Sequence, residues 1–145
     1  MKVVVQRVES ASVKVDGKIL GQIDNGYLLL VGFGQEDTEE KIDYVVKKII
    51  SLRIFSDQNG KMNLNIGQVG GKILSISQFT LYANTKDGAR PSFTESLKFD
   101  EANKYYQLFN QKLRSQGLIV EEGEFGADMK VSLVNDGPVT IIVEN

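Results

Sequence analysis

Two stretches of this sequence space their apolar residues at intervals of three and four, as one face of an α-helix requires. The first runs through residues 42–50 and follows Asp37 and Glu40, whose spacing is that of a capping box. The second starts at Asp100 and ends before Gly117, a residue suited to a C-terminal cap. We therefore predict two helices, and the rest of the chain must supply a surface that buries both apolar faces.

The other apolar segments are short and typical of β-strands. Asp16-Gly17 separates two of them and strongly indicates a hairpin turn. Residues 27–31 form a continuous apolar run, as in a strand buried on both faces. We expect one α+β domain over residues 1–145, with a largely antiparallel, curved, barrel-like sheet and the two helices packed on one side. The predicted strands cover residues 3–8, 12–16, 18–20, 27–31, 52–55, 72–82, 118–121, 129–134 and 139–143.

The chain contains no histidine and no cysteine, which narrows its chemistry. It cannot form a Ser-His-Asp triad, a Cys-His pair or a zinc site of His and Cys ligands. An ester hydrolase with this composition needs a carboxylate, a lysine, water or its own substrate as the base, and we expect neither a metal nor a cofactor. The net charge of −2 argues against tight non-specific nucleic-acid binding but allows a local basic patch. Without cysteines or an apolar run of about 20 residues, a cytoplasmic protein outside the membrane is expected.

Two segments place polar residues where the surrounding pattern is strand-like. Ser77-Gln78-Phe79-Thr80-Leu81 interrupts an apolar strand, and its plain interpretation is a strand with one solvated face. Asn135-Asp136-Gly137-Pro138-Val139-Thr140 separates two strands, and its plain interpretation is a β-turn. The residues alone leave both segments open between these structural interpretations and a functional site.

The two segments resemble the Ser-Gln-x-x-Leu and Asn-x-x-Pro-x-Thr motifs of the D-aminoacyl-tRNA deacylases. The resemblance runs from Met1 nearly to the C-terminus in the expected order, and one minor departure is Asn84, where an acidic residue is expected. The other matching stretches are Leu52-Arg53-Ile54-Phe55, Gly60-Lys61-Met62-Asn63, Val69-Gly70-Gly71, Gly88-Ala89-Arg90-Pro91-Ser92-Phe93 and Gly123-Glu124-Phe125-Gly126-Ala127-Asp128-Met129.

The resemblance implies a homodimer that hydrolyses the ester joining a D-amino acid to tRNA. It implies that the Gly137-Pro138 bond is cis and enters the partner's active site, where two parallel backbone carbonyls grip the α-ammonium group of the substrate. An L side chain would collide with these carbonyls, whereas glycine has no side chain to reject, so mischarged glycyl-tRNA is a second expected substrate.

The resemblance also implies roles for single residues near the ester. Gln78 is expected to shape the pocket with support from Ser77, and the main-chain N–H groups of Phe79 and Thr80 are expected to stabilise the oxyanion. The Thr80 hydroxyl is the alternative, as a covalent nucleophile, although no histidine is present to take its proton.

Other residues are expected to bind the terminal adenosine at the 3′ end of tRNA. Phe125 and Met129 fall in the segment that the family uses there, and core packing is an equally good interpretation of both. Lys86 and Arg90 either contact phosphates or are ordinary solvated charges. Two further alternatives stay open for the whole protein, a non-catalytic dimer that binds the tRNA end and a purely structural dimer in which Gly137-Pro138 is only a turn.

Overall fold

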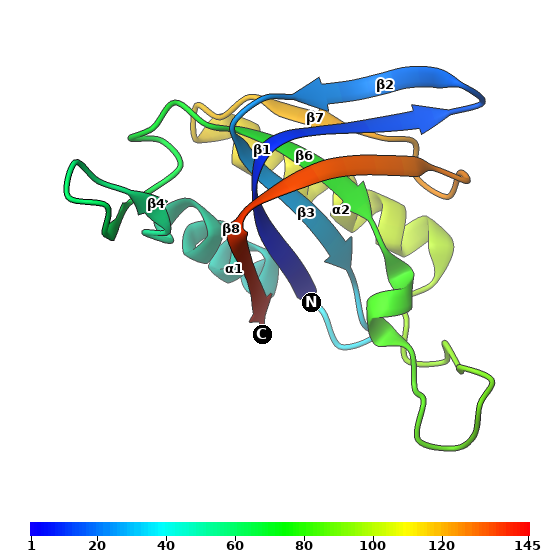
Figure 1. Ribbon diagram of the computed structural model, residues 1–145. Helices are drawn as coiled ribbons and strands as arrows, with labels where there is room; N and C mark the ends of the chain where they lie inside the picture. Colours follow the sequence, from blue (N-terminus) through cyan, green and yellow to red (C-terminus); the bar gives the residue numbers. More distant parts are fainter.

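A computed structural model describes all 145 residues of the protein. Three strands come first, followed by a helix, three more strands, a short 3₁₀ helix, a second helix and two final strands (Figure 1). The first half contains β1 (Lys2–Val15), β2 (Lys18–Ile23), β3 (Gly26–Gly32), α1 (Glu39–Ser51), β4 (Phe55–Ser56) and β5 (Met62–Leu64). The second half contains β6 (Lys72–Ser77), η1 (Phe79–Tyr82), α2 (Phe99–Ser115), β7 (Val120–Glu122) and β8 (Lys130–Glu144).

The main sheet is built around the long strand β1. Along one edge, residues 2–8 of β1 pair with β3 and residues 11–15 pair with β2, while β8 follows the other edge. These pairings are antiparallel, as predicted, whereas β6 and β7 continue the sheet beyond β3 in parallel. Because β1 changes its neighbour halfway, the sheet bends and is nearly barrel-shaped (Figure 1). The predicted curved α+β architecture is thus confirmed, with a parallel part that the pattern did not predict.

Both helices pack on the same side of the sheet, as predicted (Figure 1). Their buried faces join the sheet in a core cluster of 22 residues, and Lys112 of α2 forms an ion pair with Asp43 of α1 at 2.6 Å. A second cluster of seven buried residues lies within the bend and includes Leu74 and Ile76 of β6. Partly buried Met129 packs against this second cluster, which supports β6 where it approaches the site described below.

The hairpin between β1 and β2 confirms the turn predicted at Asp16-Gly17. Asp16 has φ +49° and Gly17 has φ +76°. Two successive positive φ values match the right-handed twist of the paired strands, which is why Asp-Gly is favoured there.

Asp37 does not cap α1, contrary to the prediction. Thr38 is the N-cap, and its hydroxyl accepts a hydrogen bond from the Lys41 N–H at 3.4 Å. The Asp37 carboxylate instead accepts from the Gly34 N–H at 2.7 Å and pairs with the α-ammonium group of Met1. Since Asp37 and this ammonium are both buried, the carboxylate satisfies charges and donors that water does not reach.

Several predicted strands have different bounds. The strands predicted over 3–8 and 12–16 are one strand, β1. The strand predicted over residues 72–82 ends at Ser77, because β3 offers no partner beyond Val31, and a turn of 3₁₀ helix follows. The strand predicted over 52–55 is reduced to the short β4. The two strands predicted over 129–134 and 139–143 are one strand, β8, which keeps its direction along β1. A β-turn at residues 135–138 is therefore wrong, because a turn would reverse the chain.

Candidate active site

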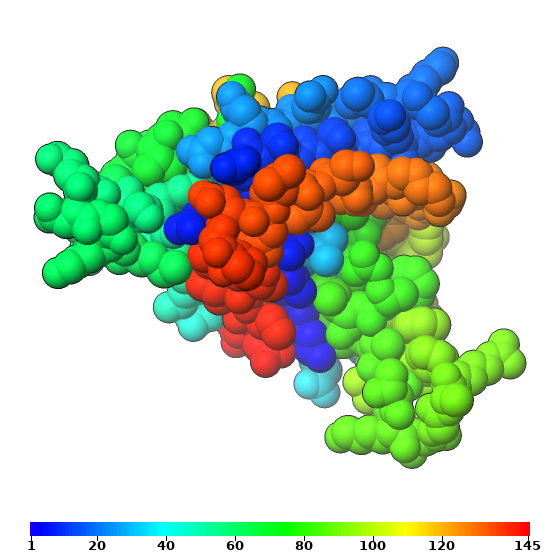
Figure 2. Space-filling view, in the orientation of Figure 1, coloured from blue at the N-terminus to red at the C-terminus, as the bar shows by residue number.

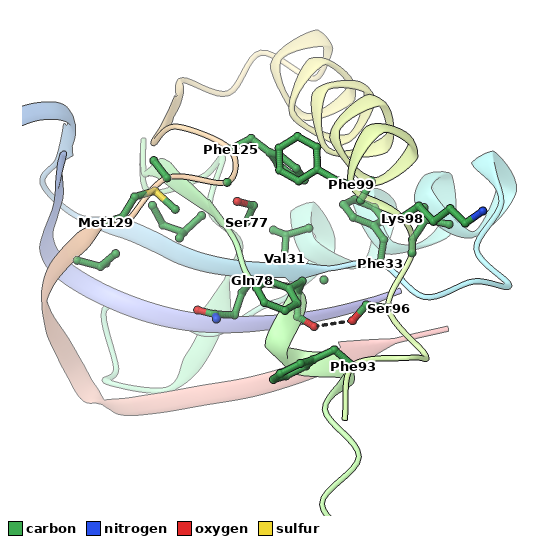
Figure 3. A pocket seen from close by; sticks show the side chains of 18 residues that line it. Val31, Phe33, Ser77, Gln78, Phe93, Ser96, Lys98, Phe99, Phe125 and Met129 are labelled. Atoms are coloured by element: carbon green, nitrogen blue, oxygen red, sulfur yellow. Dashed lines mark hydrogen bonds between the residues drawn. The ribbon is translucent and has the colours of Figure 1, made fainter. Parts of the chain in front are cut away.

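A cavity of about 650 Å³ opens where β3 and β6 end (Figure 3). Its walls come from the ends of these strands, from the loop that leads into α2, from the first turn of α2 and from the segment before β8. Such a volume is in the range that binds a small molecule or one nucleoside with a substituent. The lining residues are Val31, Gly32, Phe33, Ile76, Ser77, Gln78, Phe79, Phe93, Ser96, Leu97, Lys98, Phe99, Ala102, Phe125, Gly126, Ala127, Met129 and Val131.

The pocket is mostly apolar and contains almost no charge. Twelve of the 18 lining residues are hydrophobic, and Lys98 is the only one with a charged side chain. The polar side chains on the wall are those of Ser77, Gln78 and Ser96. No carboxylate lines the cavity, so a reaction performed there depends on Lys98, neutral side chains, main-chain groups, bound water and the substrate itself.

The predicted catalytic segment, residues 77–80, lies at this cavity. Ser77, Gln78 and Phe79 line it, and Gln78 is held where β6 ends because its N–H donates to the Val31 carbonyl at 2.7 Å. Gly32 makes this approach possible, since a Cβ there would lie 2.8 Å from the Gln78 carbonyl oxygen. Thr80 does not line the cavity, and its exposed hydroxyl accepts a hydrogen bond from the Gln78 side-chain amide.

Phe125 and Met129 also line the pocket (Figure 3). The Phe125 ring meets the Phe99 ring edge-on at 5.0 Å and the Tyr106 ring at 5.6 Å. Phe125 also packs against the main core cluster. The sequence offered two interpretations of Phe125 and Met129, core packing and binding of the terminal adenosine. They are compatible, because one face of the wall that these residues form is packed and the other is open to a ligand.

The loop from residue 83 to residue 98 forms a wall that the sequence motifs did not identify. Phe93 lines the cavity and meets the Phe79 ring edge-on at 5.1 Å. Leu97 donates its N–H to the Phe33 carbonyl at 2.9 Å, which fastens the end of the loop to β3. The signal that was available is the stretch from Gly88 to Phe93, which matched the family, although only Arg90 within it was given a role and Phe93 was not.

A buried tyrosine supports the pocket from behind. The Tyr106 hydroxyl donates to the Ser75 carbonyl at 2.8 Å, two residues before Ser77 on β6, while its ring contacts Phe125. Burial raises the pKa of Tyr106, so the hydroxyl stays protonated and remains a donor. Burial also raises the pKa of Tyr82, with the negative charges of Asp37 and Glu144 adding to the effect.

Gly137 and Pro138 lie on a bulge of β8 and do not line this chain's pocket. Gln6 and Val8 of β1 are two positions apart, yet their partners Thr140 and Asn135 are five apart, so β8 carries three extra residues. The Gly137-Pro138 peptide bond is cis, and both residues are exposed. Figure 2 shows β8, orange to red, uncovered across this face of the molecule.

The bulge is anchored by three side chains. Asn135 bridges its ends, since its amide oxygen accepts from the Val139 N–H at 3.0 Å and its amide nitrogen donates to the Thr140 hydroxyl at 2.9 Å. Buried Arg7 donates to the Asp136 carbonyl at 3.0 Å and to the Ile54 carbonyl at 2.6 Å. The Asn and Thr of the motif therefore shape the bulge. Arg7 was missed, although a charged residue in an otherwise apolar strand was the available signal.

The remaining predicted contacts lie outside the pocket. Lys86 and Arg90 are exposed, take part in no ion pair and belong to the loop whose later residues line the cavity. No group of three or more acidic side chains lies together in a way that could hold a metal ion. Neither helix has the length and apolar character needed to cross a membrane.

Comparison with known proteins assigns this fold and sequence to a family. The sequence pattern described as D-Tyr-tRNA(Tyr) deacylase matches residues 4–144. A D-aminoacyl-tRNA deacylase of Exiguobacterium sibiricum is 56% identical over 144 residues, which are 99% of each chain. A solved structure described as c-Myc DNA Unwinding Element Binding Protein is 39% identical with a TM-score of 0.94, over 100% of this chain and 99% of that one.

A further solved structure shares the fold at lower identity. It is described as a probable eukaryotic D-amino acid tRNA deacylase, and it is 17% identical with a TM-score of 0.86 over 99% of this chain and 98% of that one. The family pattern and the 56% identical relative each cover nearly the whole sequence. The chain therefore belongs to the D-Tyr-tRNA(Tyr) deacylase family.

Proposed function

We propose that this chain hydrolyses the ester that joins a D-amino acid to the terminal ribose of tRNA. Water adds to the ester carbonyl, the bond between that carbon and the ribose oxygen breaks, and the ribose oxygen takes up a proton. The products are a free D-amino acid and tRNA. Family membership makes the chain a D-aminoacyl-tRNA deacylase. The observation that supports this use of the pocket is that one cavity is lined by Ser77, Gln78, Phe79, Phe125 and Met129.

The two walls suit the two halves of the substrate. We assign the terminal adenine to the side of Phe125 and Met129, because an unpaired base stacks on an aromatic ring for about 1–3 kcal/mol. The aminoacyl ester then lies towards Ser77 and Gln78. Lys86 and Arg90 belong to the loop that forms another wall, where they are available to the phosphates of the tRNA end.

Rate enhancement is assigned to the main chain of the catalytic segment. Phe79 and Thr80 are the first residues of η1, so helix geometry provides no carbonyl partner for their N–H groups. We propose that these N–H groups stabilise the oxyanion that forms when water adds to the ester, since Phe79 lines the cavity and Thr80, whose side chain lies outside it, is the next residue of η1. Losing one such donor typically costs about 10²–10³ in rate, which is enough to matter without a charged catalyst.

The Thr80 hydroxyl is a poor candidate for a nucleophile. It accepts a hydrogen bond from Gln78, and an amide N–H cannot take its proton. The wall of the cavity contains no carboxylate that could act as a base, and its one charged side chain, Lys98, is an ammonium group that can donate but not accept a hydrogen bond. We therefore assign the activation of water to the substrate, whose neighbouring ribose hydroxyl lies beside the ester.

We assign chiral selection to the bulge of a second copy of the chain in a homodimer. Gly137 and Pro138 are exposed and lie outside their own pocket, so they are free to enter a partner's pocket. Their carbonyls there would hold the α-ammonium group and leave no space for an L side chain. Glycine presents no side chain, so glycyl-tRNA is included among the proposed substrates. We place this activity in the cytoplasm, where tRNA is aminoacylated.

The central test is a deacylation assay on D-Tyr-tRNA, L-Tyr-tRNA and Gly-tRNA with the purified chain and no added metal. We expect release of D-Tyr and of glycine, and little release of L-Tyr. Equal rates for the two tyrosine esters would end the proposed mechanism of selection. Binding of the tRNA end without turnover of any ester would favour the alternative function, a non-catalytic dimer that binds the tRNA end.

Complementation tests whether the bulge acts in the partner's pocket. Gly137→Ala and Gln78→Ala are each expected to be nearly inactive alone. In a mixed dimer, the pocket that keeps Gln78 receives an intact Gly137 from its partner. Random mixing should therefore restore about a quarter of the wild-type rate, because half of the dimers are mixed and each has one complete pocket. Mixtures that stay inactive would show that Gly137 acts within its own chain.

A further inference from the structure

We propose that Ser96 is a positioning residue that aims the Thr80 N–H at the ester through a hydrogen bond to the Phe79 carbonyl. This inference rests on the proposed function, in which that N–H stabilises the oxyanion. Ser96 belongs to none of the segments that match the family motifs. It is a pocket residue contributed by the loop before α2.

Ser96 forms its hydrogen bond with the Phe79–Thr80 peptide group, which carries the proposed oxyanion donor. The Ser96 hydroxyl donates to the Phe79 carbonyl oxygen at 3.1 Å, and Figure 3 shows this bond as a dashed line beside the pocket. The Phe79 carbonyl and the Thr80 N–H belong to one planar peptide unit and point in opposite directions. Holding the oxygen at one end therefore fixes the direction of the N–H at the other. A hydrogen bond to the carbonyl also polarises the unit and makes the N–H a stronger donor.

Local structure explains why this peptide needs support. η1 is a single turn of four residues, and none of them is buried. The Phe79 side chain itself is 58% exposed, so packing restrains it weakly. The i→i+3 hydrogen bonding of this single 3₁₀ turn has poor geometry and restrains the Phe79 carbonyl weakly, and the Ser96 hydroxyl adds a second donor to it.

Ser96 is itself held by the end of β3. It forms a β-bridge with Gly34, and its N–H donates to the Phe93 carbonyl at 3.0 Å. Gly34 is fixed in turn, because its N–H donates to Asp37 at 2.7 Å. The hydroxyl therefore sits on a framework attached to the sheet, although the loop that carries it is largely exposed. This arrangement is what a positioning group requires, since a misplacement of about 1 Å can cost on the order of 10² in rate.

The test compares Ser96→Ala with Ser96→Thr, which keeps the hydroxyl, and with Ser92→Ala as a matched control. Ser92 is on the same loop, and its side chain forms a hydrogen bond with the Thr94 hydroxyl at 3.3 Å and none with the Phe79 carbonyl. For Ser96→Ala we expect kcat on D-Tyr-tRNA to fall about tenfold with KM unchanged, since the donor is misaligned rather than removed. Ser96→Thr should recover most of the rate, and Ser92→Ala should behave as wild type.

A spectroscopic measurement separates alignment from general loosening of the loop. The amide nitrogen of Thr80 shares its peptide bond with the Phe79 carbonyl, so its ¹⁵N resonance should shift in Ser96→Ala and return in Ser96→Thr. The inference is overturned if kcat of Ser96→Ala stays within about twofold of wild type. A rise in KM alone, an equal loss in Ser92→Ala or an unmoved Thr80 resonance would also overturn it. A wild-type chain that releases no D-Tyr would instead mean that the proposed function has failed.

Discussion

The two motif segments of this molecule differ in what holds them and in which direction they face. Ser77, Gln78 and Phe79 lie on the wall of a cavity, and groups of the same chain surround them on the sheet and in the loop before α2. Gly137 and Pro138 lie on a bulge at the surface, anchored only from below by Arg7 and by the Asn135 bridge. The first segment is enclosed by its own chain, and the second is presented to something outside it.

This difference explains how the proposed enzyme divides two tasks. The catalytic wall needs groups aligned with one another, and a single fold provides that alignment. Rejection of an L-amino acid by steric exclusion needs a rigid group opposite the catalytic wall, and a second copy of the chain can supply it if its bulge is exposed. Changes in the bulge should therefore affect activity through the partner's pocket, and changes in the wall should affect the pocket of the same chain.

The largest effect is expected for Gly137→Ala. Gly137 has φ +134°, and a Cβ there would lie 2.8 Å from the Val139 side chain and 3.1 Å from the Arg7 guanidinium. The bulge must shift to accept the methyl group, and we expect kcat/KM on D-Tyr-tRNA to fall by about 10². Deacylation kinetics measure this loss, and unchanged D-specific turnover would contradict the assignment of the bulge.

Gly60→Ala is the matched control for that substitution. Gly60 also has a positive φ, +73°, but it lies in the turn between β4 and β5, and a Cβ there would meet nothing within 4 Å. Both variants carry the cost of a left-handed alanine, about 1–3 kcal/mol. A loss of activity in Gly137→Ala that is absent from Gly60→Ala can therefore be assigned to the bulge and not to backbone strain in general.

The fold was predictable where a local pattern decides the outcome. The helix over residues 42–50, the helix after Asp100 and the turn at Asp16-Gly17 were all predicted, because spacing and turn chemistry are local properties. The end of β6 at Ser77 was not predicted, because it depends on where β3 stops providing partners. Asp37 likewise has good capping chemistry, but a buried ammonium group far away in the sequence competes for its carboxylate.

The same limit applies to the site. The family resemblance singled out Gln78, Phe125 and Gly137, and the structure places the first two on the wall of one cavity. It could not identify Ser96 or Arg7, whose importance arises from contacts with residues distant in the sequence. Serine and arginine are common surface residues, so composition offers no reason to choose these two. Only their contacts in the folded structure, with the Phe79 and Asp136 carbonyls, single them out.

A smaller effect, on binding, is expected for Phe125→Ala. The substitution removes the ring that we assign to the terminal adenine, so KM for D-Tyr-tRNA should rise about tenfold while kcat changes little. Steady-state kinetics separate the two constants. Phe125 also packs on Phe99 and Tyr106, so Phe125→Leu serves to test packing alone. If leucine restores KM fully, the ring acts only through the core and the assignment of the adenine is wrong.

Thr80→Ala should change the rate less. Its hydroxyl lies outside the cavity wall and accepts a hydrogen bond from Gln78, whereas the proposed donor is its main-chain N–H, which alanine keeps. We expect kcat/KM to stay within about tenfold of wild type. A loss above about 10³ would restore the hydroxyl as a covalent nucleophile, and rapid-quench detection of an acyl-enzyme would be the next measurement.

Tyr106→Phe should affect stability more than catalysis, which is the reverse of the expectation for the bulge. The variant keeps the ring against Phe125 but leaves the buried Ser75 carbonyl without its donor, and we expect the free energy of unfolding to fall by about 1 kcal/mol at pH 7.

Because burial raises the pKa of Tyr106, the unfolded chain ionises this phenol first as pH rises. The hydroxyl's contribution is therefore complete below about pH 10 and is lost above it, so denaturant titrations of the two proteins should converge as pH rises past that value. Tyr27 and Tyr82 titrate in both proteins and cancel in the difference. A difference that stays constant at high pH would show that the ring environment, and not the hydroxyl, is what supports β6 behind the pocket.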